Sequence, residues 1–235
     1  MEDAIATTTT SSAKLWNEEY RTGGIPSSVR LRPSNVVVDF VKTARERDPR
    51  ASHALDIGCG GGRNSIYLAQ QGYTVSAIDF CQPQVERLRQ EAQLHPEWQL
   101  DAKIGSVTEP WPWPNASADI AIDAFCFKHQ IEPAGIQIYL GELRRCLKKG
   151  GLYMLFLAMR EDGYYGQFAV PQPRGIGLVI VDRGNQIASR LYSQAEIEAL
   201  FVGFGVVQFN AKVSRNEMHG QMYERHSGVW YFRRE

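Results

Sequence analysis

The chain has 235 residues, of which 43% are hydrophobic, and no net charge, because 26 basic side chains balance 26 acidic ones. A chain of this size can bury a full core in one domain, and its neutral balance gives no electrostatic reason to expect nucleic acid as a partner. No apolar run approaches the roughly 18 residues of a membrane span. Its four cysteines show no zinc spacing and are typical of free thiols in a reducing compartment. We therefore expect a cytoplasmic protein without a metal site.

The first 33 residues divide into a tail and a segment that we expect to cover the substrate side of the site. Residues 1–12 form a Thr/Ser-rich tract that predicts disorder, and residues 13–235 predict one domain. Ser12 is suited to cap a short helix that carries Trp16 and Tyr20, and a loop rich in glycine, proline and serine follows. We interpret residues 13–33 as a cover on the substrate side.

Helices and strands alternate through the middle of the chain. Strands are predicted at 54–57, 74–79, 100–104, 119–124 and 152–157, and helices at 34–48, from 64 onward, at 83–95 and at 133–147. The last of these strands shows no apolar–polar alternation, which predicts burial on both faces. Strands that alternate with helices predict a parallel sheet with right-handed crossovers.

The C-terminal third departs from this alternation. Residues 177–182 and 186–191 flank Arg183-Gly184-Asn185 and predict a β-hairpin, which makes 158–192 a second part of the cover. Ser193 and Glu196 form a capping box that opens a helix through Phe201, and strands follow at 206–213 and 229–233. The predicted fold is α/β: a doubly wound, mostly parallel, seven-stranded Rossmann-like sheet with an antiparallel C-terminal strand and a β-hairpin inserted after strand five.

The most informative motif is the run 54–62, Ala-Leu-Asp-Ile-Gly-Cys-Gly-Gly-Gly. A strand, a glycine turn and a helix start form the geometry in which backbone approaches a nucleotide-like ligand. Arg63 replaces the third glycine of the dinucleotide fingerprint, and Asp56 adds a negative charge that suits a ligand cation. Asp79 lies 21 residues beyond Gly58, where such folds place a ribose-binding acid. One acid for a cation and one for a diol fit S-adenosylmethionine (SAM).

The same run carries a family resemblance. Residues 56–69, followed by Gly-Tyr-Thr-Val at 72–75 and Ile-Asp at 78–79, resemble the first motifs of class I SAM-dependent methyltransferases. Within 60–79 the chain is most similar to the tellurite-resistance and thiopurine methyltransferase-like branch. The resemblance to the class spans 34–157. It implies SAM as the methyl donor, S-adenosylhomocysteine (SAH) as the product and no metal.

This resemblance implies a set of cofactor-binding residues. They are Asp56, Gly58, Cys59, Gly60, Asn64, Asp79, Phe80, Ser106, Val107, Ala124 and Phe125. Ser106 stands where the family often has an acid for the adenine amino group, and a hydroxyl accepts that hydrogen less strongly. Alternatives stay open for two of them, since Asp79 also suits a helix N-cap and Phe80 an ordinary core position.

Aromatic and imidazole side chains form the candidate substrate side. The substrate-binding candidates are Trp16, Tyr20, Phe127, His129, Tyr164 and Tyr165. A sulfonium methyl group is cationic and is favoured over ring faces. His129 is the candidate catalytic base, because a neutral imidazole accepts a proton from a hydroxyl or an amine near pH 7. A surface or helix-start histidine is the alternative.

The predicted function is in-line methyl transfer from SAM to a nitrogen, oxygen or sulfur nucleophile of a small molecule. No Asn/Asp-Pro-Pro-Tyr/Phe run follows the fourth strand and no Pro-Cys dipeptide occurs, which argues against methylation of bases. Two alternatives remain open: non-methyl chemistry at the same cofactor site, such as aminopropyl transfer or cyclisation, and a non-catalytic SAM-binding partner. The oligomeric state stays undetermined.

Overall fold

The structure is a computed structural model that describes residues 2–23, 30–169 and 176–235. Its large sheet contains β1 (His53–Ile57), β2 (Thr74–Asp79), β3 (Leu100–Ile104), β4 (Ala118–Ala124), β5 (Leu147–Ala158), β8 (Phe204–Met218) and β9 (Gln221–Arg234). A separate two-stranded sheet pairs β6 (Leu178–Val181) with β7 (Ala188–Leu191). The helices are α1 (Glu2–Thr22), α2 (Asn35–Arg47), α3 (Arg63–Gln70), α4 (Gln82–Leu94), α5 (Pro133–Cys146) and α6 (Gln194–Leu200), with short 3-10 helices η1 (Phe127–His129) and η2 (Tyr165–Phe168).

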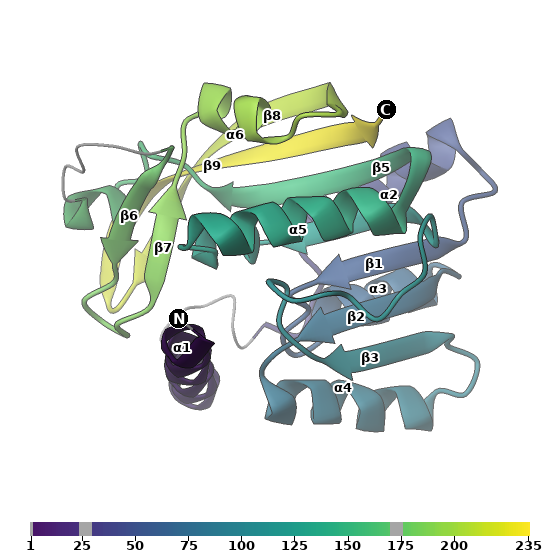
Figure 1. Cartoon of the computed structure of the whole chain (residues 1–235), viewed down its shortest axis with the longest axis horizontal. Helices are drawn as coiled ribbons and strands as arrows, with labels where there is room; N and C mark the ends of the chain where they lie inside the picture. The colour runs from purple at the N-terminus through teal and green to yellow at the C-terminus, as the bar shows by residue number, and fades with distance from the viewer. Residues whose placement is uncertain (1, 24–29, 170–175) are drawn as a thin grey trace.

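The strand order of the large sheet is β3-β2-β1-β4-β5-β9-β8. Strands β1 to β5 are parallel to their neighbours, and β9 is antiparallel to both β5 and β8. This arrangement confirms the predicted fold class, including the hairpin inserted after strand five. In Figure 1 the arrowheads of β1, β2 and β3 point toward the edge of the sheet beside α1. In open α/β sheets, ligands bind at this carboxyl edge.

Two hydrophobic layers sandwich the sheet because side chains alternate along each strand. Leu55 and Ile57 belong to the core cluster that includes residues of α5 and α6, whereas Ala54 belongs to the cluster that includes α2 and α3. Central strand β5 contributes to both layers, with Tyr153 on one side and Met154 on the other, each fully buried. Burial of such a side chain stabilises the fold by about 1.5–3 kcal/mol.

Two expectations about the ends of the chain differ from the structure. Residues 2–12 continue helix α1 instead of forming a disordered tail, because extending an existing helix costs less than starting one. The last two strands span 15 and 14 residues and run well beyond the predicted 206–213 and 229–233. Their polar extensions pair with each other, from Ser214 with Arg225 to Met218 with Gln221. Backbone hydrogen bonds hold these segments as strands although their side chains show no apolar pattern that would predict them.

Candidate active site

A cavity of about 410 Å³ opens at the carboxyl edge of the large sheet. Its walls come from α1, the glycine turn after β1, the ends of β2 and β4, η1, and helices α3 and α4. The sequence-predicted residues on this wall are Trp16, Tyr20, Gly58, Cys59, Gly60, Asn64, Asp79, Phe80, Ala124, Phe125 and His129. The fold therefore brings together segments that lie more than 100 residues apart in the chain.

The glycine turn is tightly enclosed by its neighbours. Gly58 and Gly60 have φ angles of +71° and +51°, which disfavour any side chain. A Cβ added to Gly58 would lie 2.4 Å from Cβ of Cys126, and one added to Gly60 would lie 2.3 Å from the hydroxyl oxygen of Tyr20. At Gly58 and Gly60 the turn therefore presents backbone to the cavity, because the neighbouring side chains leave no room for a Cβ.

Asp79 ties this turn to the end of β2. Its Oδ2 accepts the Gly60 N–H at 2.8 Å and its Oδ1 accepts the Cys81 N–H at 2.8 Å. Burial raises the pKa of the carboxyl group above its ordinary value, and the two backbone donors counteract this shift. Each carboxylate oxygen keeps a second lone pair, so a side chain that already orders the turn can also accept hydrogen bonds from a ligand.

Asp56 and Asn64 serve mainly to organise the backbone around the cavity. Asp56 is 1% exposed and does not belong to the cavity wall; its Oδ2 accepts the Ser65 hydroxyl at 2.6 Å. Burial raises its pKa to about 6. Oδ1 of Asn64 accepts the Ser34 N–H at 3.0 Å and so links the start of α2 to α3. Asp56 therefore lies away from the cavity wall in this structure, and its predicted contact with the ligand, direct or through water, stays a prediction.

Ser106 and Val107 also lie off the cavity wall. The Ser106 hydroxyl is 2.8 Å from the Thr108 hydroxyl, and Val107 is buried in the core cluster of α5. Their predicted contacts with adenine stay predictions.

Three of the six substrate-side candidates lie away from the cavity wall. Phe127 is fully buried and packs against Tyr139 and Phe201 at ring-centroid distances of 5.0 and 5.3 Å. It belongs to the core cluster that includes residues of α5 and α6, and it does not line the cavity.

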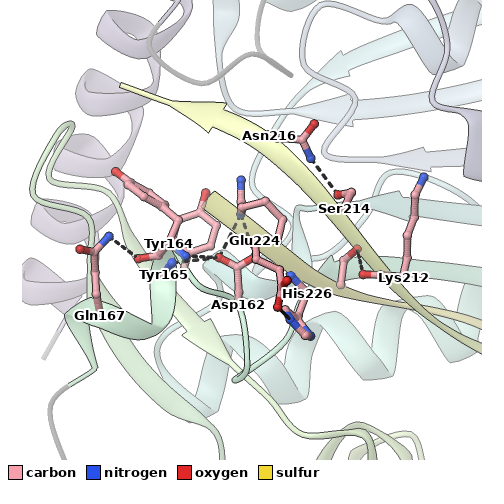
Figure 2. Close-up of polar contacts among 11 residues, drawn as sticks. Asp162, Tyr164, Tyr165, Gln167, Lys212, Ser214, Asn216, Glu224 and His226 are labelled. Atoms are coloured by element: carbon pink, nitrogen blue, oxygen red, sulfur yellow. Dashed lines mark hydrogen bonds and ion pairs between the residues drawn. The ribbon is translucent and has the colours of Figure 1, made fainter. Parts of the chain in front are cut away.

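Tyr164 and Tyr165 are buried against the long β8–β9 hairpin (Figure 2). Oδ1 of Asp162 accepts both of their backbone N–H groups, at 3.2 and 2.9 Å, and Oδ2 accepts the N–H of His226 at 3.1 Å. The Tyr164 hydroxyl donates to Asp182 at 2.7 Å. These two tyrosines therefore anchor the connection after β5 to the hairpin, and they do not line the cavity.

His129 does line the cavity, and its surroundings select one tautomer. Nδ1 lies 2.9 Å from the carbonyl oxygen of Ala188 and 3.2 Å from the Ser189 hydroxyl. Because a carbonyl only accepts, Nδ1 carries the hydrogen and Nε2 keeps a lone pair. Burial, reinforced by the charge of Lys128, lowers the pKa of His129 well below its ordinary value. The imidazole is therefore neutral at pH 7.

Asp123 organises the loop between β4 and η1 and was not recognised in the sequence. Its oxygens accept the N–H groups of Cys126 and Phe127, each at 2.8 Å, and the Tyr139 hydroxyl at 2.6 Å. The carboxyl group is fully buried, which raises its pKa to about 7. The only sequence signal for this role is its position: Asp123 lies near the end of β4, just before a turn that contains no glycine.

Arginines form a second feature that the sequence did not predict. Arg30 and Arg63 line the cavity, and burial together with the neighbouring Arg30 charge lowers the pKa of Arg63. Among the described residues, no carboxylate lies within ion-pair distance of either guanidinium. Two cations that face a cavity without such a partner suit a ligand carboxylate.

The described residues show neither a metal-ligand cluster nor a helix suited to a membrane. They contain no cluster of three or more His, Cys, Asp or Glu side chains placed to hold a metal ion. None of the helices formed by these residues is both long and apolar enough to cross a membrane.

Residues 54–151 match the family described as "Methyltransferase domain". Over 125 residues, 53% of this chain, the sequence is 30% identical to the O-antigen chain terminator bifunctional methyltransferase/kinase of Escherichia coli; the match spans 17% of that protein. Over 189 residues, 80% of this chain and 73% of the relative, it is 26% identical to a ubiquinone biosynthesis O-methyltransferase of Xanthomonas oryzae.

A solved structure shares the fold. The 1,6-didemethyltoxoflavin-N1-methyltransferase of Burkholderia thailandensis, solved with 1,6-didemethyltoxoflavin and SAH, superposes with a TM-score of 0.65 at 21% identity, over 92% of this chain and 84% of that one. The comparisons do not single out the tellurite-resistance and thiopurine branch, so that assignment stays a prediction.

Proposed function

We propose that this chain, which matches a methyltransferase domain over residues 54–151, is a class I SAM-dependent methyltransferase that transfers a methyl group from SAM to a small-molecule acceptor. One observation carries the proposal: a turn in which four of the five residues 58–62 are glycine lies beside a cavity, and the Asp79 carboxylate accepts the Gly60 N–H at 2.8 Å. This is the arrangement expected for a ribose-binding acid next to a backbone cradle.

Different wall residues contact the ribose, the adenine and the methionine carboxylate of SAM. The remaining lone pairs of Asp79 accept the ribose hydroxyls, and Phe80 covers the adenine side. Arg30 and Arg63 attract the methionine carboxylate. Asp56 supports the turn through Ser65 instead of touching the ligand. SAH is the product, and the proposal needs no metal.

The remaining wall residues contribute to the methyl-transfer step itself. The sulfonium is already a good leaving group, so the protein mainly aligns nucleophile, methyl carbon and sulfur and excludes water. The rings of Tyr20 and Phe125 line the cavity beside the glycine turn, where they favour the cationic methyl group. The neutral charge balance and the free cysteines support a cytoplasmic enzyme acting on a small molecule and not on nucleic acid.

Replacement of Gly58 by alanine tests the proposal. Because the added Cβ would lie 2.4 Å from Cβ of Cys126, the turn must move, and we expect SAH to bind about 100-fold more weakly. Isothermal titration calorimetry with SAH measures this loss. Wild-type protein should bind SAH and SAM but not NAD, and labelled methyl groups should appear in an acceptor.

Gly72→Ala is the matched control. Gly72 has a φ of +80°, close to that of Gly58, but a Cβ there meets nothing within 4 Å. Both variants therefore carry a similar backbone strain of about 1–2 kcal/mol, and only Gly58→Ala disturbs the cavity. Equal SAH affinity of the two variants, or no SAH binding by the wild-type protein, would contradict the proposed site.

A further inference from the structure

We infer that the acceptor is a flat, uncharged molecule whose nucleophilic atom carries a hydrogen, as in a phenol or a ring N–H, and that Nε2 of His129 accepts this hydrogen. The inference rests on the proposed function, because it concerns the second substrate of the same cavity. It goes beyond that function by naming a substrate class and by giving His129 a defined role toward the nucleophile.

The charges of the cavity wall lie on one side of the glycine turn. Arg63, Arg87 and Glu91 belong to α3 and α4, and Asp79 ends β2. Arg30 lies near enough to Arg63 for its charge to lower the pKa of that side chain. The opposite side is formed by α1, the end of β4 and η1, and its described lining residues are Trp16, Tyr20, Ala124, Phe125, Cys126, His129 and Gln130. None of these is charged at neutral pH, because burial raises the pKa values of Tyr20 and Cys126 and lowers that of His129.

This distribution selects against a charged acceptor. An ammonium or carboxylate group that enters the uncharged side loses its hydration and finds no ionic partner among the described wall residues. A neutral molecule pays a much smaller desolvation penalty. We therefore expect a neutral acceptor to bind better than a cation or an anion of the same shape.

The rings of the uncharged side favour a flat molecule. The ring centroids of Trp16 and Tyr20 are 5.8 Å apart, and Trp16 meets the His129 ring edge-on at 4.9 Å. Phe125 adds a further ring from the end of β4. Aromatic faces and edges bury planar ligands well and supply specific stacking geometries.

The requirement for a hydrogen comes from His129. The Ala188 carbonyl occupies Nδ1, so Nε2 is the ring nitrogen left with a lone pair for a ligand. Among the described residues, the ionisable side chain that shifts the pKa of His129 is Lys128, its neighbour in the same 3-10 helix. The other neighbours of the ring are uncharged: the Ala188 carbonyl and the Ser189 hydroxyl from β7, and the Trp16 indole from α1. A lone pair held in this way orients a donor O–H or N–H toward the methyl carbon.

The transfer step needs only SAM, the acceptor, His129 and water. A lone pair of the acceptor atom forms the bond to the methyl carbon while the carbon–sulfur bond breaks, and that electron pair remains on sulfur to give SAH. The methylated atom then bears a positive charge and its hydrogen. This hydrogen passes to Nε2 as a proton and from the imidazolium to water. A protonated ether is a far stronger acid than imidazolium, so the low pKa of His129 does not prevent this transfer.

A panel of four naphthalenes tests the substrate class on the full-length protein. The panel contains 1-naphthol, 1-methoxynaphthalene, 1-naphthoate and 1-naphthylmethylammonium, which share one ring system and differ in charge and in the donor hydrogen. Calorimetry on the SAH-loaded protein should show that 1-naphthol binds at least tenfold more tightly than the other three. Methyl-labelled SAM should label 1-naphthol and neither charged compound.

The outcomes separate this inference from the proposed function. Tighter binding of either charged naphthalene, equal binding of the methoxy compound, or binding of none of the four to SAH-loaded protein would overturn the inference and leave the cofactor site intact. Failure of SAH itself to bind would overturn the proposed function.

Substitution of His129 tests its role. We expect His129→Ala to lose about 100-fold in kcat with 1-naphthol, the size of a typical acid–base contribution, while its affinity for SAH stays within twofold of wild type. Added imidazole should restore part of the turnover, which a purely structural role would not predict. Unchanged kcat, or a loss that imidazole does not rescue in a variant that still binds SAH, would overturn the assignment.

The pH profile of the wild-type enzyme provides a test that needs no variant. Because the pKa of His129 is depressed, Nε2 stays unprotonated as the pH falls through 6.5. We expect kcat/KM for 1-naphthol to stay level from pH 7.5 to 5.5, whereas a histidine of ordinary pKa would produce about a tenfold fall. A tenfold fall over this range would contradict the assigned state of His129.

Discussion

Replacement of Asp79 by alanine is expected to weaken SAH binding by roughly 100-fold. The side chain has two tasks, since its oxygens hold the N–H groups of Gly60 and Cys81 and the same oxygens face the cavity. Alanine removes the acceptor for the ribose hydroxyls and releases the turn. Hydrogen bonds to a charged group contribute about 1.5–3 kcal/mol each, and ~2.8 kcal/mol corresponds to that factor.

Calorimetry with SAH measures this effect, and two further variants interpret it. Asp79→Asn keeps one carbonyl acceptor and should show an intermediate loss. Asp101→Ala is the control, because Asp101 lies on the neighbouring strand β3, is exposed and pairs only with Lys103 at 3.0 Å among the ion pairs of the described residues. Surface ion pairs contribute about 0–1 kcal/mol, so Asp101→Ala should bind SAH like wild type. Undiminished affinity in Asp79→Ala would rule out Asp79 as the ribose-binding acid.

Replacement of Asp123 by alanine is expected to reduce the free energy of unfolding by about 3–5 kcal/mol. The substitution removes the acceptor of the Cys126 and Phe127 N–H groups and of the Tyr139 hydroxyl, which keeps only the Tyr153 hydroxyl at 2.9 Å as a partner. For a chain of this length, the expected fall in Tm is on the order of 10 °C. Thermal and urea unfolding measure it, with Asp101→Ala again as the control, which should change the stability by less than about 1 kcal/mol.

The titration of Asp123 gives this prediction a second readout. Its pKa in the folded state is raised from the ordinary 3.8 to about 7, so the folded state favours the neutral carboxyl group. The stabilisation from this preference is present below pH 4 and is lost as the pH rises toward 7, at about 1.4 kcal/mol per pH unit. Asp123→Asn is neutral at every pH. We therefore expect its stability relative to wild type to increase from pH 4 to pH 7, and a constant difference would show that Asp123 titrates normally.

The helices and strands between residues 34 and 158 were predictable because their signals are local. Strands β2 and β3 have the predicted bounds, since a short apolar run between turn residues defines each of them. The glycine turn and Asp79 were predictable for the same reason: a turn that requires positive φ needs glycine, and an acid at the end of a strand lies at the carboxyl edge of the sheet.

The wall of the cavity was only partly predictable. Trp16, Tyr20 and His129 line it, but Phe127, Tyr164 and Tyr165 belong to hydrophobic clusters. All six lie in or beside segments whose aromatic side chains could have faced either way. Composition therefore identified the right segments without identifying the right side chains.

What the sequence by itself determined was the order of elements, the parallel sheet and the donor-side motif, because hydrophobic periodicity and turn chemistry act over a few residues. Only the tertiary structure decided which groups meet. Phe125 adopts a φ of +77°, so no periodic rule gives the direction of the side chains that follow it. The Ala188 carbonyl that selects the tautomer of His129 lies 59 residues away in the chain. Contacts of this kind depend on how separate elements pack, and no local pattern records that packing.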